Sequence, residues 1–228
     1  MKNFIFIILA FLCFSFTMAQ EVFEKTVALE KNKNAEMNFD FADNIVIKSW
    51  ENSEVSVKAT VNINDNADNS KYELNVEPVA SGIKMTGKIN NPKSLSDHSY
   101  QVVDSAITKS DDQCVKIDID YEVFLPEGTT IALETISGNI ELTGFEAPVY
   151  IKTISGFIDF SIDPHLKASF ETKTITGEVY SDLDLETENK ESDMRVFRGG
   201  HIMATLNGGG KSIKLETISG DIYLRKEK

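Results

Sequence analysis

The sequence is poor in cysteine, which limits the covalent chemistry that can hold the chain together. Its 228 residues contain two cysteines, Cys13 and Cys114. Cys13 lies in an apolar N-terminal run, so Cys114 is the single thiol expected in the mature chain, and an intramolecular disulfide is excluded. A domain of this size can bury enough apolar surface to fold without one. We therefore expect Cys114 to be a small residue near the start of a strand and not a nucleophile.

Basic residues are also scarce relative to acidic ones. The chain has 23 Lys and Arg against 36 Asp and Glu, which gives a formal net charge of -13. No basic tract offsets this acidity, and an acidic surface repels nucleic acid and anionic membrane surfaces. The composition therefore argues against nucleic acid as a partner and is compatible with an exported protein.

Long apolar runs are missing except at the N-terminus. One positive charge precedes the apolar residues 4–16, and small residues follow, which is typical of a secretory signal peptide. The run is shorter than the roughly 20 apolar residues that a spanning helix needs. We predict that residues 1–19 are cleaved and that 20–228 form a single domain without a membrane span, in the periplasm, on the cell surface or secreted. Lipidation of Cys13 is the alternative, but Leu12 stands where a lipoprotein signal has a small residue.

Helical periodicity is missing as well, and alternation of apolar and polar residues takes its place. Residues 54–63 and 115–123 alternate along their whole length, which is typical of strands with one buried face. Two polar segments interrupt this pattern. The Asn- and Asp-rich residues 64–70 predict a hairpin loop, and residues 90–113 predict a long surface excursion. The sequence therefore predicts an all-β protein.

One short string recurs four times in the second half of the chain. "LETISG" occurs twice, and "KTISG" and "KTITG" are closely related to it. A degenerate copy, "MATLNGG", places Thr205 and Gly208 in the same frame. A period near 20 residues in a strand-rich chain predicts a coiled sheet, or β-solenoid, in which each turn stacks on the last. The four strings end at glycines 18, 21 and 43 residues apart, namely Gly138, Gly156, Gly177 and Gly220.

The side-chain pattern changes phase across each string. Ile131, Leu133 and Thr135 precede the first glycine on one parity, whereas Ile140 and Leu142 follow it on the other. A regular strand cannot change parity without a bulge or bend, because successive side chains point to opposite faces. We therefore predict that the four glycines occupy equivalent structural bends, where a Cβ would be hindered.

The order of these motifs is similar to that of a known family. "YEVFLPEGTTIALETISGNIELTG" followed by "VYIKTISGFIDFSI", with "NIVIKSWENSEVSVKA" earlier, resembles the bacterial exported β-solenoid domain of unknown function known as a putative adhesin. The resemblance covers about residues 23–224, except 90–113. It implies a short right-handed β-helix with turns of about 18–21 residues, preceded by N-terminal strands and hairpins. It supplies no catalytic residues and no cofactor.

"NGGGKS" at 207–212 is similar to the end of a phosphate-binding loop. Such a loop needs a glycine where Thr205 stands, and a helix must follow it, whereas a strand pattern follows here. We therefore interpret this string as a glycine-rich turn between strands and expect no nucleotide.

Residues with the usual spacing of metal ligands are few. In the segment 62–73, Asn replaces the charged first ligand of a calcium loop, and Ala67 stands where such a loop demands glycine. The histidines are isolated from one another and show no ligand spacing. We expect no bound metal, and calcium at 62–73 stays an alternative. The residues concerned are Asn62, Asn64, Asn66, Asp68 and Glu73, and the histidines are His98, His165 and His201.

Acidic residues in the repeat region leave an enzymatic alternative open. If several met on one face beside an arginine, they would resemble the acid pairs of polysaccharide-cleaving enzymes. Outward acids are also what the solvated face of any acidic sheet presents, and Lys152 and Lys173 are placed to pair with Glu134 across turns. The residues of this alternative are Asp159, Asp182, Asp184, Asp193, Arg195 and Arg198.

These observations favour a non-enzymatic module that binds a protein or glycan partner, or has a structural role, at the bacterial cell envelope, as an adhesin would. A periplasmic accessory of envelope sensing or assembly is the first alternative. A glycan-active β-helix enzyme is the second, and it requires a groove where two carboxylates converge on Arg or Lys. The terminal strands of such a sheet need a cover, for which Trp50 is a candidate.

Overall fold

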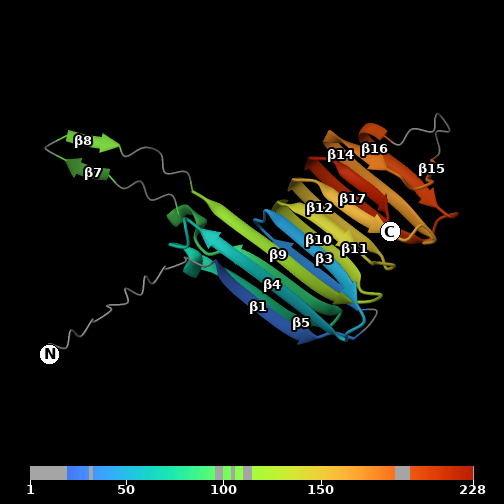
Figure 1. The fold of residues 1–228 in the computed structure, drawn as a ribbon, viewed down its shortest axis with the longest axis horizontal. Coiled ribbons are helices and arrows are strands. Elements are labelled where there is room, and N and C mark those ends of the chain that lie inside the picture. Colours follow the sequence, from blue (N-terminus) through green and yellow to red (C-terminus); the bar gives the residue numbers. More distant parts are fainter. Residues whose placement is uncertain are drawn as a thin grey trace, which may run out of the picture.

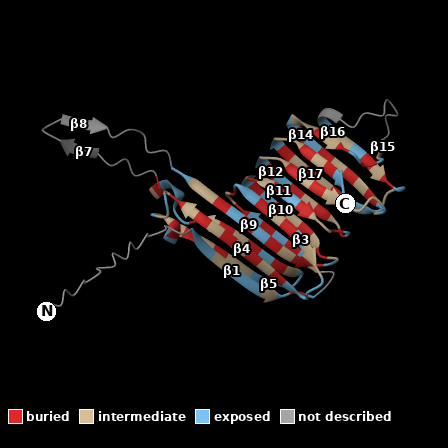
Figure 2. Cartoon of the chain, viewed as in Figure 1, coloured by how far each residue is buried: buried red, intermediate tan, exposed pale blue. Residues whose placement is uncertain are grey.

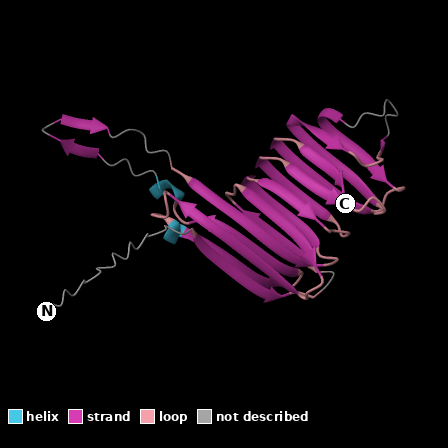
Figure 3. Cartoon of the chain, viewed as in Figure 1, coloured by secondary structure: helices cyan, strands magenta, loops and turns pink. Residues whose placement is uncertain are grey.

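The structure is a computed structural model that describes residues 20–30, 33–95, 100–103, 106–109, 115–187 and 196–227. The expected signal peptide, His98, Cys114, Asp193 and Arg195 lie outside these ranges. Most of the described chain is strand, with two short 3-10 helices (Figure 3). The all-β prediction is confirmed. Within these ranges, no helix is long and apolar enough to cross a membrane.

The elements follow one another along the chain with short connections. They are β1 (Glu21–Ala28), β2 (Asn34–Phe39), β3 (Asn44–Trp50), β4 (Glu54–Ile63), η1 (Asn69–Lys71), β5 (Tyr72–Val79), β6 (Gly82–Ile89), η2 (Pro92–Leu95), β7 (Tyr100–Val103), β8 (Ala106–Lys109), β9 (Ile117–Pro126), β10 (Thr130–Ser137), β11 (Asn139–Thr143), β12 (Val149–Ser155), β13 (Ile158–Ile162), β14 (Ala168–Ser181), β15 (Glu186–Thr187), β16 (Val196–Leu206), β17 (Lys211–Ser219) and β18 (Ile222–Lys226).

Sixteen strands form one continuous sheet that turns back on itself (Figure 1). The order is β1-β4-β9-β3-β11-β13-β18-β14-β17-β12-β10-β2-β6-β5, with β16 beside β14 and β15 beside β16. The path turns back at β14, because the first part of this strand pairs with β17 and its last part with β18. At the other end the rings of Phe23 on β1 and Tyr72 on β5 are 5.0 Å apart. The sheet is therefore nearly closed and barrel-like.

The interior is one apolar core enclosed by the folded sheet. Buried and exposed residues alternate along the strands (Figure 2). The predicted change of parity is confirmed, since Ile131 and Leu133 before the first bend and Ile140 and Leu142 after it are at most 1% exposed. Period-2 alternation thus identified the inward face on both sides of the bend.

Parallel pairing predominates in the part of the sheet that contains the repeat. The strands β2, β10, β12, β17 and β14 pair in parallel in one half of the sheet, and β3, β11, β13, β18 and β14 do so in the other. Successive strands such as β10 and β11 lie in opposite halves and meet at a repeated string. Antiparallel pairing is concentrated in the N-terminal part, where β1 pairs with β4, β4 with β9, and β5 with β6.

The stacking order departs from the chain order, which corrects one prediction. Strands β17 and β18 lie between β12–β13 and β14, so Gly220 lies between Gly156 and Gly177. The interval between Gly177 and Gly220 contains β16, which runs antiparallel to β14. Thr205 lies on β16, so "MATLNGG" is not a copy of the bend.

Two further expectations about local structure, at 64–70 and at Trp50, are wrong, and the structure adds detail to a third. Residues 64–70 do not close a hairpin, because β4 and β5 are not neighbours and lie in different parts of the sheet path. The 90–113 excursion contains η2 and a two-stranded sheet of β7 and β8, so it is partly regular. Trp50 covers no terminal strand. It ends β3, its ring stacks on Phe124 of β9 at 5.2 Å, and its indole N–H donates to the carbonyl of Glu54 at 2.8 Å.

Candidate functional site: a tyrosine and arginine face on β13, β14 and β18

The four repeat glycines form a column across neighbouring strands. The N–H groups of Gly138, Gly156 and Gly220 donate to Ser155, Ser219 and Thr176 on the adjacent strand at 3.0–3.2 Å. A Cβ added at Gly156 would collide with the carbonyl oxygen of Gly138. A Cβ at Gly220 would collide in the same way with the carbonyl oxygen of Gly156, and a Cβ at Gly177 with that of Gly220. Each glycine therefore makes room for the backbone of its neighbour.

The four bends are not identical in backbone conformation. Gly138, Gly156 and Gly220 have φ angles of 138°, 112° and 145°, which L side chains rarely adopt. Gly177 has no such φ, and it lies inside the uninterrupted strand β14. Gly138, Gly156 and Gly220 thus each lie between two consecutive strands, whereas Gly177 occupies the same column within one long strand.

The threonine of each repeat has a hydrogen-bonding role at the bend. The hydroxyls of Thr135 and Thr153 donate to the carbonyls of Ser137 and Ser155 at 2.8 and 2.9 Å. Thr174 and Thr217 donate to the carbonyls of neighbouring repeat glycines at 3.0 and 3.4 Å. The carbonyls of Ser137 and Ser155 also accept the backbone N–H groups of Ala42 and Gly138, so the threonine hydroxyls supply them with a second donor at the bend. Threonine and glycine of the repeat are therefore structural.

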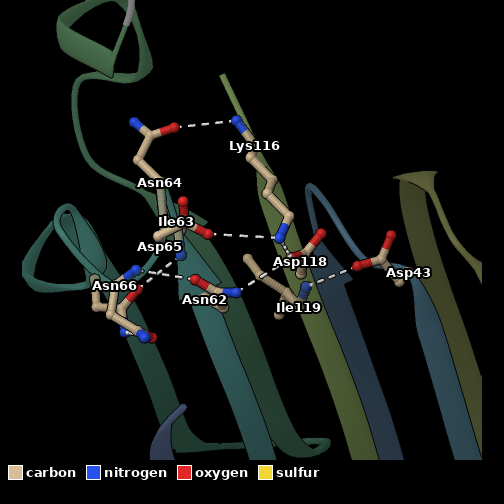
Figure 4. A network of polar contacts seen from close by, with 10 residues as sticks. Asp43, Asn62, Ile63, Asn64, Asp65, Asn66, Lys116, Asp118 and Ile119 are labelled. Atoms are coloured by element: carbon tan, nitrogen blue, oxygen red, sulfur yellow. Dashed lines mark hydrogen bonds and ion pairs between the residues drawn. The ribbon is translucent and has the colours of Figure 1, made fainter. Parts of the chain in front are cut away.

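The Asn- and Asp-rich loop after β4 directs its polar groups to one another and to β9 (Figure 4). Asn62 accepts the N–H of Asn66 at 2.9 Å and donates to Asp118 at 3.2 Å. Asn64 accepts the N–H of Lys116 at 3.0 Å and donates to Asp68 at 2.6 Å. The oxygens that would serve calcium thus accept hydrogen bonds in this network. No cluster of three or more His, Cys, Asp or Glu suited to a metal is found in the described part of the chain.

Three of the acidic residues of the enzymatic alternative lie on neighbouring strand ends, with different cations from those expected. Asp159 on β13 pairs with Arg225 on β18 at 2.9 Å. Asp182 accepts the N–H of Lys226 at 2.6 Å, and the ammonium of Lys226 is 3.2 Å from Asp184. The sequence did not point to Arg225 and Lys226, because nothing in "DIYLRKEK" distinguishes them from other surface cations. Their role becomes visible only when β18 is seen to lie between β13 and β14. The side chain of Arg198 lies outside the described part.

Two tyrosines extend this group of charges into a face. Tyr180 on β14 and Tyr223 on β18 stand opposite each other in the parallel register, with rings 5.1 Å apart and 10° from parallel. The guanidinium of Arg225 lies 5.0 Å from the Tyr223 ring centre, a distance typical of cation–π contact. Phe157 meets Tyr223 edge-on at 6.1 Å. This stack could not be predicted from the sequence, because β14 and β18 are far apart in the chain.

The polar groups of the face are held in place by one another. The Tyr180 hydroxyl donates to Glu178 at 2.6 Å, which raises the pKa of Tyr180 to about 12. Burial raises the pKa of Tyr223, and the hydrogen bond from its hydroxyl to Asp221 acts in the same direction. Burial also raises the pKa of Asp159, against the opposing effect of Arg225. Both phenols are therefore protonated at neutral pH and act as donors, which suits binding better than nucleophilic chemistry.

A groove of about 540 Å³ opens beside the loops that follow β9 and β11. Its walls include Glu127, Glu146 and Lys211, all of them exposed to solvent. Two carboxylates and a lysine are thus among the residues that line this groove. The acids of the glycan-active alternative, Asp159 and Asp182, are not among its lining residues.

The remaining motif residues lie in separate turns and strands. "NGGGKS" forms the turn from β16 to β17, where the side-chain amide of Asn207 donates to the carbonyls of Pro164 and Leu166 at 2.9 Å. His165 lies in the turn before β14, and His201 on β16 is 3.0 Å from Glu171. These positions agree with the interpretation of the glycine-rich string as a turn.

Comparisons with known proteins identify the fold. No protein-family model matches the chain, and no curated protein matches it. The structure is similar to a putative cell adhesion protein from Clostridium sporogenes, with 13% identity, a TM-score of 0.51, and coverage of 91% of this chain and 100% of that one. Putative adhesins from Bacteroides fragilis and Parabacteroides distasonis match at 8% identity, with TM-scores of 0.22 and 0.23 and coverage of 91% and 90% of this chain and 98% and 97% of theirs.

The first of these likenesses concerns the fold alone, and the other two have scores too low to support an argument. The resemblance to bacterial putative adhesins, which the motifs indicated, is confirmed at that level.

Proposed function

We propose that this protein is an exported, non-enzymatic binding module of the bacterial cell envelope, with an adhesin-like role. Its repeat region is then a short solenoid with its last turn inserted between earlier ones, an interpretation that the glycine column and the parallel registers support. The shared fold with a putative cell adhesion protein supports the role. The tyrosine and arginine face is the single observation on which the binding function rests.

The composition of this face is suited to recognition. Tyrosine and arginine are enriched among the residues that dominate binding energy at interfaces. Tyr180 and Tyr223 are partly exposed, and their hydroxyls are fixed by carboxylates two positions earlier in the chain. A face whose side chains are already ordered loses little conformational entropy on binding. Because each phenol already donates its one hydrogen to a carboxylate, the partner is a protein or glycan that offers hydrogen-bond donors to the phenol oxygens and acceptors to the guanidinium.

A binding experiment with a matched control tests this proposal. The purified chain is applied to arrays of bacterial and host glycans and of extracellular-matrix proteins. The double variant Tyr180→Ala with Tyr223→Ala is expected to bind any retained ligand at least about tenfold more weakly. Tyr150→Ala removes a partly exposed tyrosine from β12 in the other half of the sheet and is expected to leave binding unchanged. Equal loss in both variants, or no retained ligand, contradicts the proposal.

The location is tested separately on intact cells. Protease added from outside is expected to digest the protein if it is exposed at the surface. Protection until the outer membrane is broken contradicts the adhesin role and favours a periplasmic accessory.

A further inference from the structure

The isoleucine of each repeated string remains without a structural role at the bend. Threonine donates to bend carbonyls and glycine makes room for the backbone, but the residue between threonine and serine points outward. Isoleucine occupies this position in all four strings, at exposed fractions of 44%, 47%, 45% and 62% for Ile136, Ile154, Ile218 and Ile175. Large apolar side chains that stay this exposed mark a candidate contact surface when they gather in one patch.

The four isoleucines lie next to one another. The flanking threonines and serines pair in register from β10 to β12 and from β12 to β17, and Thr174 and Thr176 of β14 do so with Thr217 and Ser219 of β17. The spatial order is therefore Ile136, Ile154, Ile218, Ile175. With strands about 4.8 Å apart, they form a row about 14 Å long, which we call the isoleucine ridge.

A second row of side chains runs beside the ridge, two positions earlier on the same strands. It consists of Glu134, Lys152, Glu216 and Lys173 in spatial order, which we call the charge ladder. The charges alternate along it. In chain order the two lysines would be adjacent, so the alternation exists only because β17 lies between β12 and β14. Lys173 consequently lies opposite Glu216 and not near Glu134, which corrects the expected pairing of Lys173 with Glu134.

We propose that the isoleucine ridge is a dimerisation surface whose occupant is the ridge of a second copy of this chain. A two-fold contact pairs each residue with its counterpart in reversed order when the two ridges run antiparallel. The charge ladder of one copy then faces the reversed ladder of the other. Glu134 lies opposite the partner copy's Lys173, and Lys152 opposite its Glu216. All four cross-contacts join opposite charges.

The parallel alternative is less favourable. It would bring the charge ladder of one copy against the row beyond the glycines in the other, which contains Asn139, Phe157, Asp221 and Glu178. Glu216 would then face Asp221, which is repulsive, and only Lys173, opposite Glu178, would meet an opposite charge. Charge complementarity therefore selects both the partner and the antiparallel orientation. This inference is independent of the tyrosine and arginine face.

The association is expected to be reversible. A ridge of four side chains with one flanking ladder is smaller than the roughly 800 Å² per partner of a standard interface, which places it among weak or transient contacts. The dimer is then populated at micromolar concentrations, or where many copies are held close together on a surface.

Sedimentation of the full chain, expressed with its own leader and purified from the exported fraction, tests the ridge. The wild type is expected to shift from monomer to dimer as its concentration is raised through the micromolar range. The variant Ile154→Asp with Ile218→Asp places charges at the centre of the ridge and is expected to remain monomeric. Val79→Asp is the matched control, because Val79 is 39% exposed on β5, outside the ridge. Circular dichroism verifies that each variant is folded.

Charge reversal tests the orientation. Glu134→Lys alone places two like-charged contacts in the antiparallel dimer, one at each end, and is expected to weaken it about fivefold. Adding Lys173→Glu restores opposite charges at both ends and is expected to restore dimerisation. A rescue supports the antiparallel ridge. A wild type that stays monomeric, an isoleucine variant that still dimerises, or a double reversal that is no better than the single one overturns the proposal.

Discussion

The repeat region and the N-terminal region of the sheet are held together by different contacts. In the repeat region, glycines, threonines and aliphatic side chains recur at the same place on β10, β12, β17 and β14. In the N-terminal region the largely aliphatic interior contains an aromatic cluster whose contacts each occur once. Phe39 stacks on Tyr121 at 4.1 Å, and the buried hydroxyl of Tyr72 donates to that of Tyr121 at 3.1 Å.

The two regions differ in how many distant segments of the chain must meet to form each contact. A repeated bend needs only a copy of itself on the next strand, so a short string suffices to specify it. The aromatic cluster needs residues from β2, β5 and β9 to meet, and Gly87 of β6 leaves room for the two tyrosine hydroxyls. Burial raises the pKa of both Tyr72 and Tyr121, in agreement with a dry interior.

The largest effect is expected in the glycine column. Gly156→Ala should lower the free energy of unfolding by about 3 kcal/mol or more, because a Cβ there meets the carbonyl of Gly138 and φ is strained as well. Gly208→Ala has a comparable φ of 80° with nothing within 4 Å of the added Cβ, so about 1 kcal/mol is expected. Urea unfolding measures both. Equal losses of stability in the two variants would mean that the strained φ, and not the close approach of the neighbouring strand, requires glycine at the bend.

An intermediate effect is expected in the aromatic cluster. Tyr121→Phe removes the acceptor of the Tyr72 hydroxyl in a buried site, which should lower the free energy of unfolding by about 2 kcal/mol. The double variant with Tyr72→Phe should recover part of this loss, since no polar group is then left unpaired. Additive losses in the thermal unfolding of the four proteins would show that the two hydroxyls are not coupled.

The smallest effects are expected from two buried threonines that differ in hydrogen bonding. Thr153→Val removes the bond to the Ser155 carbonyl and should cost about 1 kcal/mol. Thr172 is the one buried side chain of the described residues whose oxygen has no partner, so Thr172→Val should stabilise the fold by about 1 kcal/mol. Denaturant midpoints compare the two. An unchanged midpoint for Thr153→Val would contradict the bend role of the repeat threonine, and a lowered midpoint for Thr172→Val would contradict the expected gain at that position.

The sequence predicted the local features of this protein well and the long-range ones poorly. The inward residues, such as Ile131 and Ile140, followed from period-2 alternation because parity is a property of neighbouring residues. The hairpin expected at 64–70 was wrong, because turn-forming residues specify that the chain turns and not which strand it joins next. The tyrosine stack was missed for the same reason, since Tyr180 and Tyr223 meet only through the pairing of β14 with β18.

By itself the sequence determined that the chain is all-β, where its strands change face, and which residues line the interior. These properties follow from alternation and from glycine, which act over a few residues. Only the tertiary structure decided that β17 inserts between β12 and β14, and β18 between β13 and β14. That insertion brings Arg225 to Asp159 and Tyr223 to Tyr180, and it turns Glu134, Lys152, Lys173 and Glu216 into an alternating row. Strand order depends on contacts between distant segments, which no local pattern encodes.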